Sequence, residues 1–316
     1  MKKKCLLCII STILLCSCGS KETNQYNKQL YFVFATPLAN HPLWLQTKRG
    51  FEDACKELNV ICDWIGPTAI STEDMEEVYE TAILKEVDGI ITQGVIRKEL
   101  IDEARKVGIP TILVDSKIDG ANPYLTISKN FKEQAQLLLN DIENTLTDQP
   151  FLQIAIQVSN LKFNLAIQQI EAVKEVFKDY PGGFEIVDIT ESKSDKVQSR
   201  DEWVKVFEKS DDINVALNFA GETAIGCVQA YDKVQPKQRP LIYGVDDMRG
   251  TLNYIVQGKI KGSIVTSFYK YGYDSLYFLY NAIHDKESNE TIDRSANIVL
   301  VNQNNINNYN DYKKKD

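Results

Sequence analysis

The chain has 316 residues, of which 43% are hydrophobic and 25% charged, and its formal net charge is −8. This composition is typical of a globular protein with about two domains, and it excludes a collagen-like chain, a coiled coil and a disulfide-rich miniprotein. The acidic charge disfavours a nucleic-acid partner, because a phosphate backbone would be repelled. With two histidines, His41 and His284, no histidine-rich metal cluster is expected, and neither a metal nor a cofactor is predicted.

The first 28 residues predict a leader peptide and a tether. Residues 1–4 are basic at three positions, and the apolar run at 5–15 is too short for a membrane span, which needs about 20 residues. The sequence LCSCGS that follows resembles the lipobox of bacterial lipoproteins, with Cys18 as the acylated residue. We therefore expect a signal peptide at 1–17, lipidation at Cys18, a polar tether at 18–28 and membrane contact through the lipid alone. A plain cleaved signal without acylation is the alternative.

Besides Cys18, the chain after cleavage would retain Cys55, Cys62 and Cys227. An odd number of cysteines at wide spacing does not form a disulfide framework. Small buried thiols are therefore the favoured interpretation for all three. A bridge between Cys55 and Cys62 stays open, because the sequence alone does not establish it.

From residue 30 onward, apolar strands alternate with amphipathic helices. In the first part, strands are predicted at 30–36, 60–65, 89–92, 110–115 and 124–128, with helices at 42–58, 71–85 and 97–107. In the second part, strands are predicted at 153–158, 184–190, 215–219, 241–245, 263–268 and 297–301, with helices at 130–146, 161–178, 197–209, 222–234, 247–257 and 269–284. This alternation predicts parallel sheets, and about ten strands divide better into two sheets than into one. Because ligands of such sheets bind at the carboxyl ends of the strands, two facing sheets would enclose a cleft.

Seven short motifs occur in order along the chain. They are NHPLW at 40–44, KRGFEDA at 48–54, DGII at 88–91, GIPTILVD at 108–115, YGVDD at 243–247, GKIKGSI at 258–264 and NINNY at 305–309. Together they resemble the type I periplasmic-binding-protein family, in its branch that binds ribose, galactose and other sugars. The resemblance covers residues 30–309, which is nearly all of the chain beyond the leader.

The resemblance implies an α/β fold with two Rossmann-like lobes, parallel sheets and a three-stranded hinge. The N-terminal lobe would comprise residues 29–127 plus 268–295, and the C-terminal lobe 128–267 plus 296–309. Residues 310–316 would form a frayed tail.

The resemblance also implies a function. The expected protein is a monomeric, lipid-anchored, extracytoplasmic receptor of the cell envelope that closes on a small polar ligand, a sugar or polyol, and delivers it to an ABC importer. The alternative is a ligand-sensing lipoprotein that partners a histidine kinase or a chemoreceptor.

The family's binding positions map onto four residues of this chain. Asp115 and Asp246 stand at the carboxyl ends of predicted strands, where the resemblance places acids that accept hydrogen bonds from sugar hydroxyls. His41 matches a hydrogen-bonding position and Trp44 an aromatic that stacks on the sugar. For His41 a plain turn residue at the start of a helix stays open, and for Trp44 a core position does.

Four further candidate contacts depart from the family pattern. Ser116 and Asn164 stand where many members have arginine. Gly221 and Glu222 take the place of an Asn-Asp pair, and Thr266 replaces a glutamine on the hinge side. Asparagine cannot replace the two-pronged contact of arginine with equal strength. We therefore expect a ligand other than the common pentoses and hexoses, or weaker binding. These losses also make the sensing alternative more credible.

Enzymatic activity is not predicted. The sequence has no serine nucleophile elbow, no P-loop, no dinucleotide glycine fingerprint and no HExxH motif. A hydrolase built on this scaffold remains a third and weaker interpretation, since a fold does not fix a function.

Overall fold

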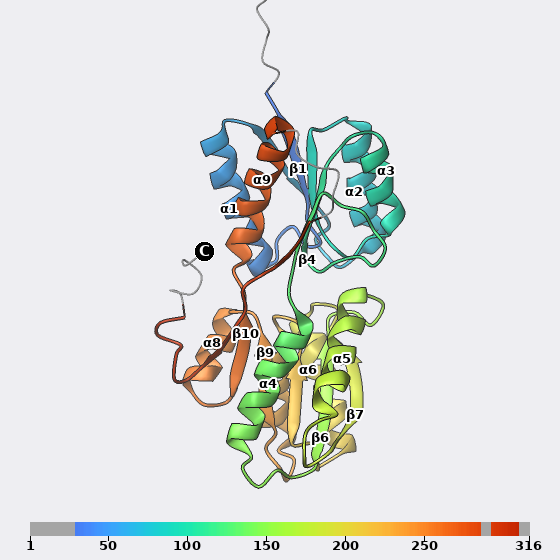
Figure 1. The fold of residues 1–316 in the computed structure, drawn as a ribbon. Helices are drawn as coiled ribbons and strands as arrows, with labels where there is room; N and C mark the ends of the chain where they lie inside the picture. The colour runs from blue at the N-terminus through green and yellow to red at the C-terminus, as the bar shows by residue number, and fades with distance from the viewer. Residues whose placement is uncertain (1–28, 286–291, 310–316) are drawn as a thin grey trace, which may run out of the picture.

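The computed structural model describes residues 29–285 and 292–309 (Figure 1). The predicted signal peptide, the lipidation site Cys18, the tether and the frayed tail at 310–316 lie outside the described residues. Within these residues, no helix is long and apolar enough to cross a membrane.

The first lobe is built on a six-stranded sheet in which every pair of neighbouring strands is parallel. Its order is β11-β5-β4-β3-β1-β2. The bounds are β1 (Tyr31–Ala35), β2 (Ile61–Ile65), β3 (Gly89–Gln93), β4 (Thr111–Asp115), β5 (Leu125–Ser128) and β11 (Ile292–Ser295). Helices α1 (Pro42–Leu58) and α9 (Phe268–Asp285) cover one face, and α2 (Thr72–Leu84) and α3 (Lys98–Lys106) cover the other (Figure 1).

The side-chain alternation along β1 explains this layering. Phe32 and Phe34 are buried in the cluster beneath α1 and α9, whereas Val33 and Ala35 are buried in the cluster beneath α2 and α3. Successive side chains of a strand point to opposite faces, so a continuous apolar run requires a cover on both sides. The run at 30–36 therefore forms an internal strand, as its composition predicts.

The second lobe has the same plan, with the order β12-β10-β9-β8-β6-β7. Its strands are β6 (Leu152–Val158), β7 (Phe184–Glu191), β8 (Val215–Asn218), β9 (Leu241–Val245), β10 (Gly262–Val265) and β12 (Val299–Asn302). Its helices are α4 (Phe131–Thr145), α5 (Asn164–Phe177), α6 (Lys196–Lys209), α7 (Thr223–Val234) and α8 (Arg249–Val256). Buried residues of α4 and α5 fill the core on one face of the sheet, and those of α6 and α7 fill it on the other.

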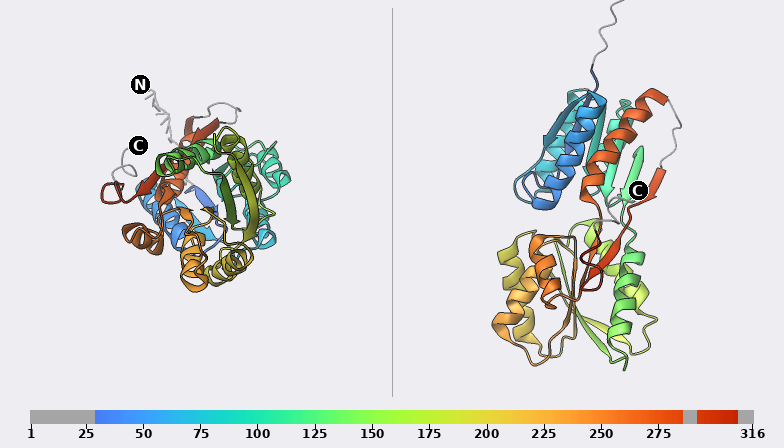
Figure 2. Two further views of the ribbon diagram at one scale, coloured as in Figure 1. Left: turned by 90° about the horizontal axis from the view of Figure 1, so that it is seen from below. Right: turned by 90° about the vertical axis from the view of Figure 1, so that its left-hand side faces the viewer.

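The chain crosses between the lobes three times, from β5 to α4, from β10 to α9 and from β11 to β12 (Figures 1 and 2). The two lobes are stacked along the long axis of the molecule, with the crossing segments between them. This arrangement confirms the predicted two-lobed α/β fold with a three-stranded hinge.

Two strands differ from the sequence prediction. No strand was predicted at β11, whose four residues are all exposed and therefore lack an apolar pattern; it pairs in parallel with β5 at the edge of its sheet. The last strand, β12, was predicted, but it runs antiparallel to β10. The chain enters the second lobe through the third crossing, from β11, and runs directly back along β10, with no helix in between to reverse its direction.

The favoured interpretation of three buried thiols is wrong for two of the cysteines. Cys55 on α1 and Cys62 on β2 form a disulfide, with their Cα atoms 6.3 Å apart. The turn between α1 and β2 brings the two residues together, because Asn59 ends the helix in a left-handed conformation and the chain reverses there. Cys227 is a buried free thiol, as predicted.

Candidate ligand-binding cleft

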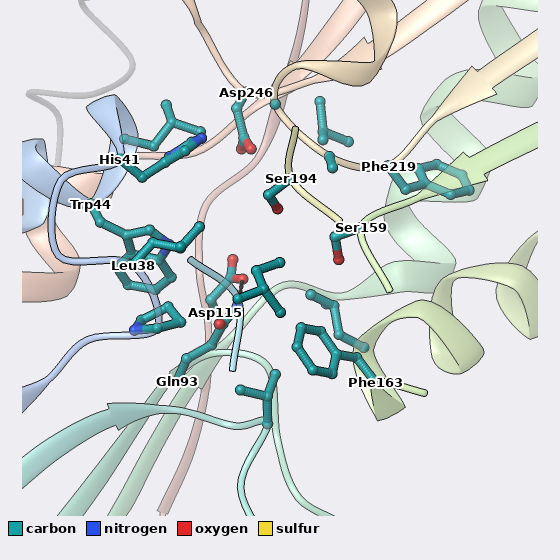
Figure 3. A pocket seen from close by; sticks show the side chains of 18 of the residues that line it. Leu38, His41, Trp44, Gln93, Asp115, Ser159, Phe163, Ser194, Phe219 and Asp246 are labelled. Atoms are coloured by element: carbon teal, nitrogen blue, oxygen red, sulfur yellow. Dashed lines mark hydrogen bonds between the residues drawn. The ribbon is translucent and has the colours of Figure 1, made fainter. Parts of the chain in front are cut away.

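A cavity lies between the lobes, where the carboxyl ends of the two sets of parallel strands face each other (Figure 3). Its wall is contributed by residues at or just beyond the ends of β1, β3, β4, β6, β8 and β9, which include Leu38, Gln93, Asp115, Ser159, Phe219 and Asp246. The sequence predicted a cleft at this edge, and the structure encloses one there.

Asp115 and Asp246 project into the cavity from opposite lobes (Figure 3). Asp115 is the last residue of β4, and Asp246 directly follows β9. Both are buried, with 4% and 6% of their surface exposed. Both also adopt left-handed backbone conformations, with φ of 69° and 66°. Such a conformation is uncommon outside glycine, and strain of this kind gathers at functional sites.

Lys129 connects these two acids. Its Nζ lies 2.9 Å from Oδ1 of Asp115 and 3.4 Å from Oδ1 of Asp246, and 5.3 Å from the centre of the Phe268 ring. Burial alone would lower the pKa of Lys129, but the attraction of the two carboxylates outweighs it and raises this pKa above its usual range. The lysine therefore stays charged, and it joins an acid of each lobe across the hinge.

The two acids differ in their surroundings. Asp115 also accepts hydrogen bonds from Nε2 of Gln93 at 2.8 Å and from the hydroxyl of Tyr271 at 3.5 Å. For Asp246, burial raises the pKa to about 6, although Lys129 opposes the shift. Asp246 is thus the acid whose charge is less completely compensated.

Glu222 reaches the same cavity from the residue before α7. It is buried, with 3% of its surface exposed. Its Oε1 accepts a hydrogen bond from Oγ of Ser192 at 2.6 Å, while its Oε2 has no partner among the described residues. Burial raises the pKa of Glu222, and the nearby carboxylates of Asp246 and Asp195 raise it further.

His41 and Trp44 line the first lobe's side of the cavity (Figure 3). His41 caps α1 through its backbone alone, and its buried Nδ1 has no hydrogen-bond partner among the described residues. Burial lowers the pKa of His41 to about 4, so the ring is neutral near pH 7. Trp44 is 6% exposed and packs edge-on against Phe34 and Phe268. The structure therefore makes Trp44 both a core residue and part of the cavity wall.

The other three predicted site residues, Ser116, Thr266 and Asn164, are not among the described residues that line this cavity. Oγ of Ser116 donates to the carbonyl oxygen of Gly94 at 3.1 Å, within the core of the first lobe. Oγ1 of Thr266 donates to the carbonyl oxygen of Asn297 at 2.9 Å, and so joins two crossing segments of the hinge. Asn164 begins α5, but its neighbours Phe163 and Leu165 line the cavity in its place.

Sequence reasoning missed several residues of the wall. Lys129, Gln93, Phe163, Phe219 and Phe268 all line the cavity. A usable signal existed for some of them, because Phe219 and Phe268 end predicted strands and Lys129 follows one, which is where the ligands of parallel sheets bind. Gln93 lies one residue beyond a predicted strand and gave the same signal.

The family profile of the periplasmic binding protein domain matches residues 32–287. The chain belongs to this family. A periplasmic binding protein binds its solute outside the cytoplasm. No protein with a curated description matches the chain.

Three solved structures are similar in fold to this periplasmic binding protein. XylFII in a XylFII–LytSN complex is 22% identical over 87% of this chain and 98% of that one, with a TM-score of 0.79. GanP, a glucose-galactose binding protein from Geobacillus stearothermophilus, is 20% identical over 88% of this chain and 98% of that one, with a TM-score of 0.79. An ABC transporter solute binding protein from Burkholderia graminis, solved with D-arabinose, is 17% identical over 89% and 98%, with a TM-score of 0.80.

Proposed function

We propose that this chain is a receptor that closes around a small polar ligand of the sugar or polyol class and delivers it to an ABC importer. The observation that carries the proposal is the pair Asp115 and Asp246, which face each other across one cavity from two lobes. Ionised carboxylates accept strong hydrogen bonds from hydroxyl groups. The rings of Trp44, Phe163 and Phe219 offer apolar faces for the C–H side of a polyol.

The geometry supports binding by closure. A ligand that bridges Asp115 and Asp246 gains its full set of contacts only when both lobes surround it, so it favours the closed arrangement. Lys129 adds a donor between the two acids and fixes their orientation. Three crossing segments allow the lobes to rotate relative to each other while each core stays packed.

The anchor is part of the proposal. The lipobox-like sequence before Cys18 supports acylation of that residue, and the polar tether would hold a monomeric receptor at the membrane surface. Mass spectrometry of the mature N-terminal peptide tests this point, since an unmodified Cys18 would contradict it.

Calorimetry of the full-length protein in detergent, against a panel of sugars, polyols and amino sugars, tests the receptor function. Asp115→Asn and Asp246→Asn should each weaken the binding of any ligand found by roughly 10- to 100-fold, because a hydrogen bond to a charged group contributes about 1.5–3 kcal/mol. Asp212→Asn, an exposed acid of the second lobe outside the cavity wall, is the matched control. Equal binding by all three variants would contradict the assignment of the site.

A sensing role is the second candidate. It is favoured by the similarity in fold to XylFII, which was solved together with LytSN. Deleting the gene distinguishes the two functions, because a transport receptor is needed for uptake of the ligand and a sensor is needed for the transcriptional response to it.

A further inference from the structure

The cavity wall has an unbalanced set of charges. Four charged side chains line it within the described residues, namely Asp115, Glu222, Asp246 and Lys129. Three carboxyl groups therefore face one ammonium group. Among the described residues that line the wall there is no arginine.

The single lysine is already engaged. Its ammonium group lies within ion-pair distance of both Asp115 and Asp246, and it is shared between them. Glu222 does not share in this compensation, because the charged groups that act on it most strongly, Asp246 and Asp195, are both negative. The one lysine of the wall thus leaves the third acid without a counter-charge.

Glu222 also has an unused hydrogen-bonding atom. Its side chain is more than nine-tenths buried and lines the cavity, and Oε2 has no partner among the described residues. A buried carboxylate is costly unless a cation and a donor reach it. A ligand hydroxyl supplies the donor alone, whereas a ligand ammonium group supplies the donor and the charge together.

The rest of the wall suits a cation. Trp44, Phe163 and Phe219 line the same cavity as Glu222, and aromatic rings attract cations. A carboxylate-bearing ligand would instead meet three acids, of which only two share a lysine.

We propose that the ligand is a polyol or sugar that carries an ammonium group, and that Glu222 is the carboxylate that receives this group. The inference rests on the proposed receptor function and names its substrate class. Hydroxyl groups of the same ligand would be left for Asp115, Asp246 and Lys129.

The test is calorimetric titration of the full-length protein with ligands that differ in one group. The set is sorbitol, glucamine and gluconate, together with glucose, glucosamine and N-acetylglucosamine. Each amine should bind about tenfold or more tightly than its hydroxyl counterpart, because a charged hydrogen bond exceeds a neutral one by about that factor. The N-acetyl form, which keeps the substituent and loses the charge, should not share this gain, and gluconate should bind more weakly than sorbitol.

Glu222→Gln isolates the residue, because glutamine keeps an oxygen for the bond from Ser192 and removes the charge. The ratio of amine affinity to hydroxyl affinity should fall close to one in this variant, because the amines lose their ion pair and weaken more than sorbitol does. Glu208→Gln, on the exposed face of α6, is the matched control and should keep the preference. Cooperative thermal unfolding of each variant confirms that it is folded.

The possible failures are distinguishable. If sorbitol and glucose bind as tightly as their amines, the amine inference is overturned and the receptor function stands. If Glu222→Gln keeps the amine preference, the assignment to Glu222 is overturned. If the folded wild-type protein binds no member of the set or of the wider panel, the proposed receptor function fails together with the inference.

Discussion

Asp115 and Asp246 occupy equivalent places in the two lobes and share the same unusual backbone conformation. Each stands at the carboxyl end of a parallel strand with φ near that of a left-handed helix, where most side chains are strained. Aspartate tolerates this conformation better than bulky or β-branched residues do. A glycine would be easier to accommodate in either position, but it would bring no carboxylate to the cavity. The conformation is therefore explained by what the side chain does.

His41 gives a prediction at the same scale. Because burial lowers the pKa of its ring from 6.5 to about 4, the unfolded chain binds more protons than the folded one between these pH values. The contribution of His41 to stability is thus complete above about pH 6.5 and is lost as the pH falls toward 4. As the pH falls from about 6.5 to 4, the Tm of the wild type should therefore decrease relative to the Tm of His41→Asn.

Asp246 has a raised pKa and therefore the opposite effect on stability as the pH falls. Because the wild type and His41→Asn both contain Asp246, its effect cancels in the difference between their Tm values. Asparagine also preserves the helix cap, since it is a favoured residue at that position. The same substitution at the exposed His284 is the matched control. Melting curves whose difference stays constant from pH 7 to pH 4.5 would contradict the prediction.

Among the elements, the pair α1 and α9 sets the shape of the cavity's first wall. The helices come so close that a Cβ atom on Gly50 would lie 2.0 Å from the carbonyl oxygen of Tyr269, and one on Gly272 would lie 2.0 Å from that of Thr47. Oγ1 of Thr47 also donates to the carbonyl oxygen of Phe268 at 2.9 Å. This close approach brings the rings of Trp44 and Phe268, one from each helix, to 5.4 Å at the cavity.

Gly272→Ala should therefore separate the helices. Since the obstructing atom belongs to the backbone of α1 and cannot rotate away, we expect the free energy of unfolding to fall by about 1–3 kcal/mol, as for other overpacked contacts. Urea denaturation measures this change. Asn281→Ala, at an exposed position of the same helix, should have little effect, and equal stability of the two variants would show that the contact tolerates a methyl group.

At the scale of the whole molecule, Lys129 holds the two lobes together electrostatically. It lies in the first crossing segment, between β5 and α4, and pairs with an acid of each lobe. Both ion pairs are buried, with about 6–7% of each side chain exposed. In this setting removing one partner costs more than the pair itself contributes, because it leaves buried charges uncompensated.

Lys129→Met should consequently lower the free energy of unfolding by about 3–5 kcal/mol. It should also open the cleft, because Asp115 and Asp246 then repel each other across it, and small-angle X-ray scattering should show a larger radius of gyration. Adding Asp246→Asn should restore part of both losses, which a purely steric defect would not allow. Lys132→Met, at an exposed lysine of α4, is the control.

Two features could be predicted from the residues: the layered α/β architecture, from the residue pattern, and the acids Asp115 and Asp246, with the help of the family resemblance. Apolar strands alternating with amphipathic helices admit little besides two layered α/β lobes, because each strand must be covered on both faces. A carboxylate at the end of such a strand is placed at the carboxyl edge of the sheet by the chain's own geometry, and the family resemblance singles out Asp115 and Asp246 among such positions.

The other features depend on contacts between distant segments, because periodicity shows that a residue is buried and does not show what lies against it. Lys129 meets Asp246 only because two distant segments converge at the hinge. Glu222 has no counter-charge among the described residues, because the charged groups brought close to it, Asp246 and Asp195, are both acids. Ser116 is buried like the cavity's own residues, yet it bonds to Gly94 inside one lobe. β11 could not be predicted, because its four exposed residues show no apolar alternation and form a strand only through their pairing with β5.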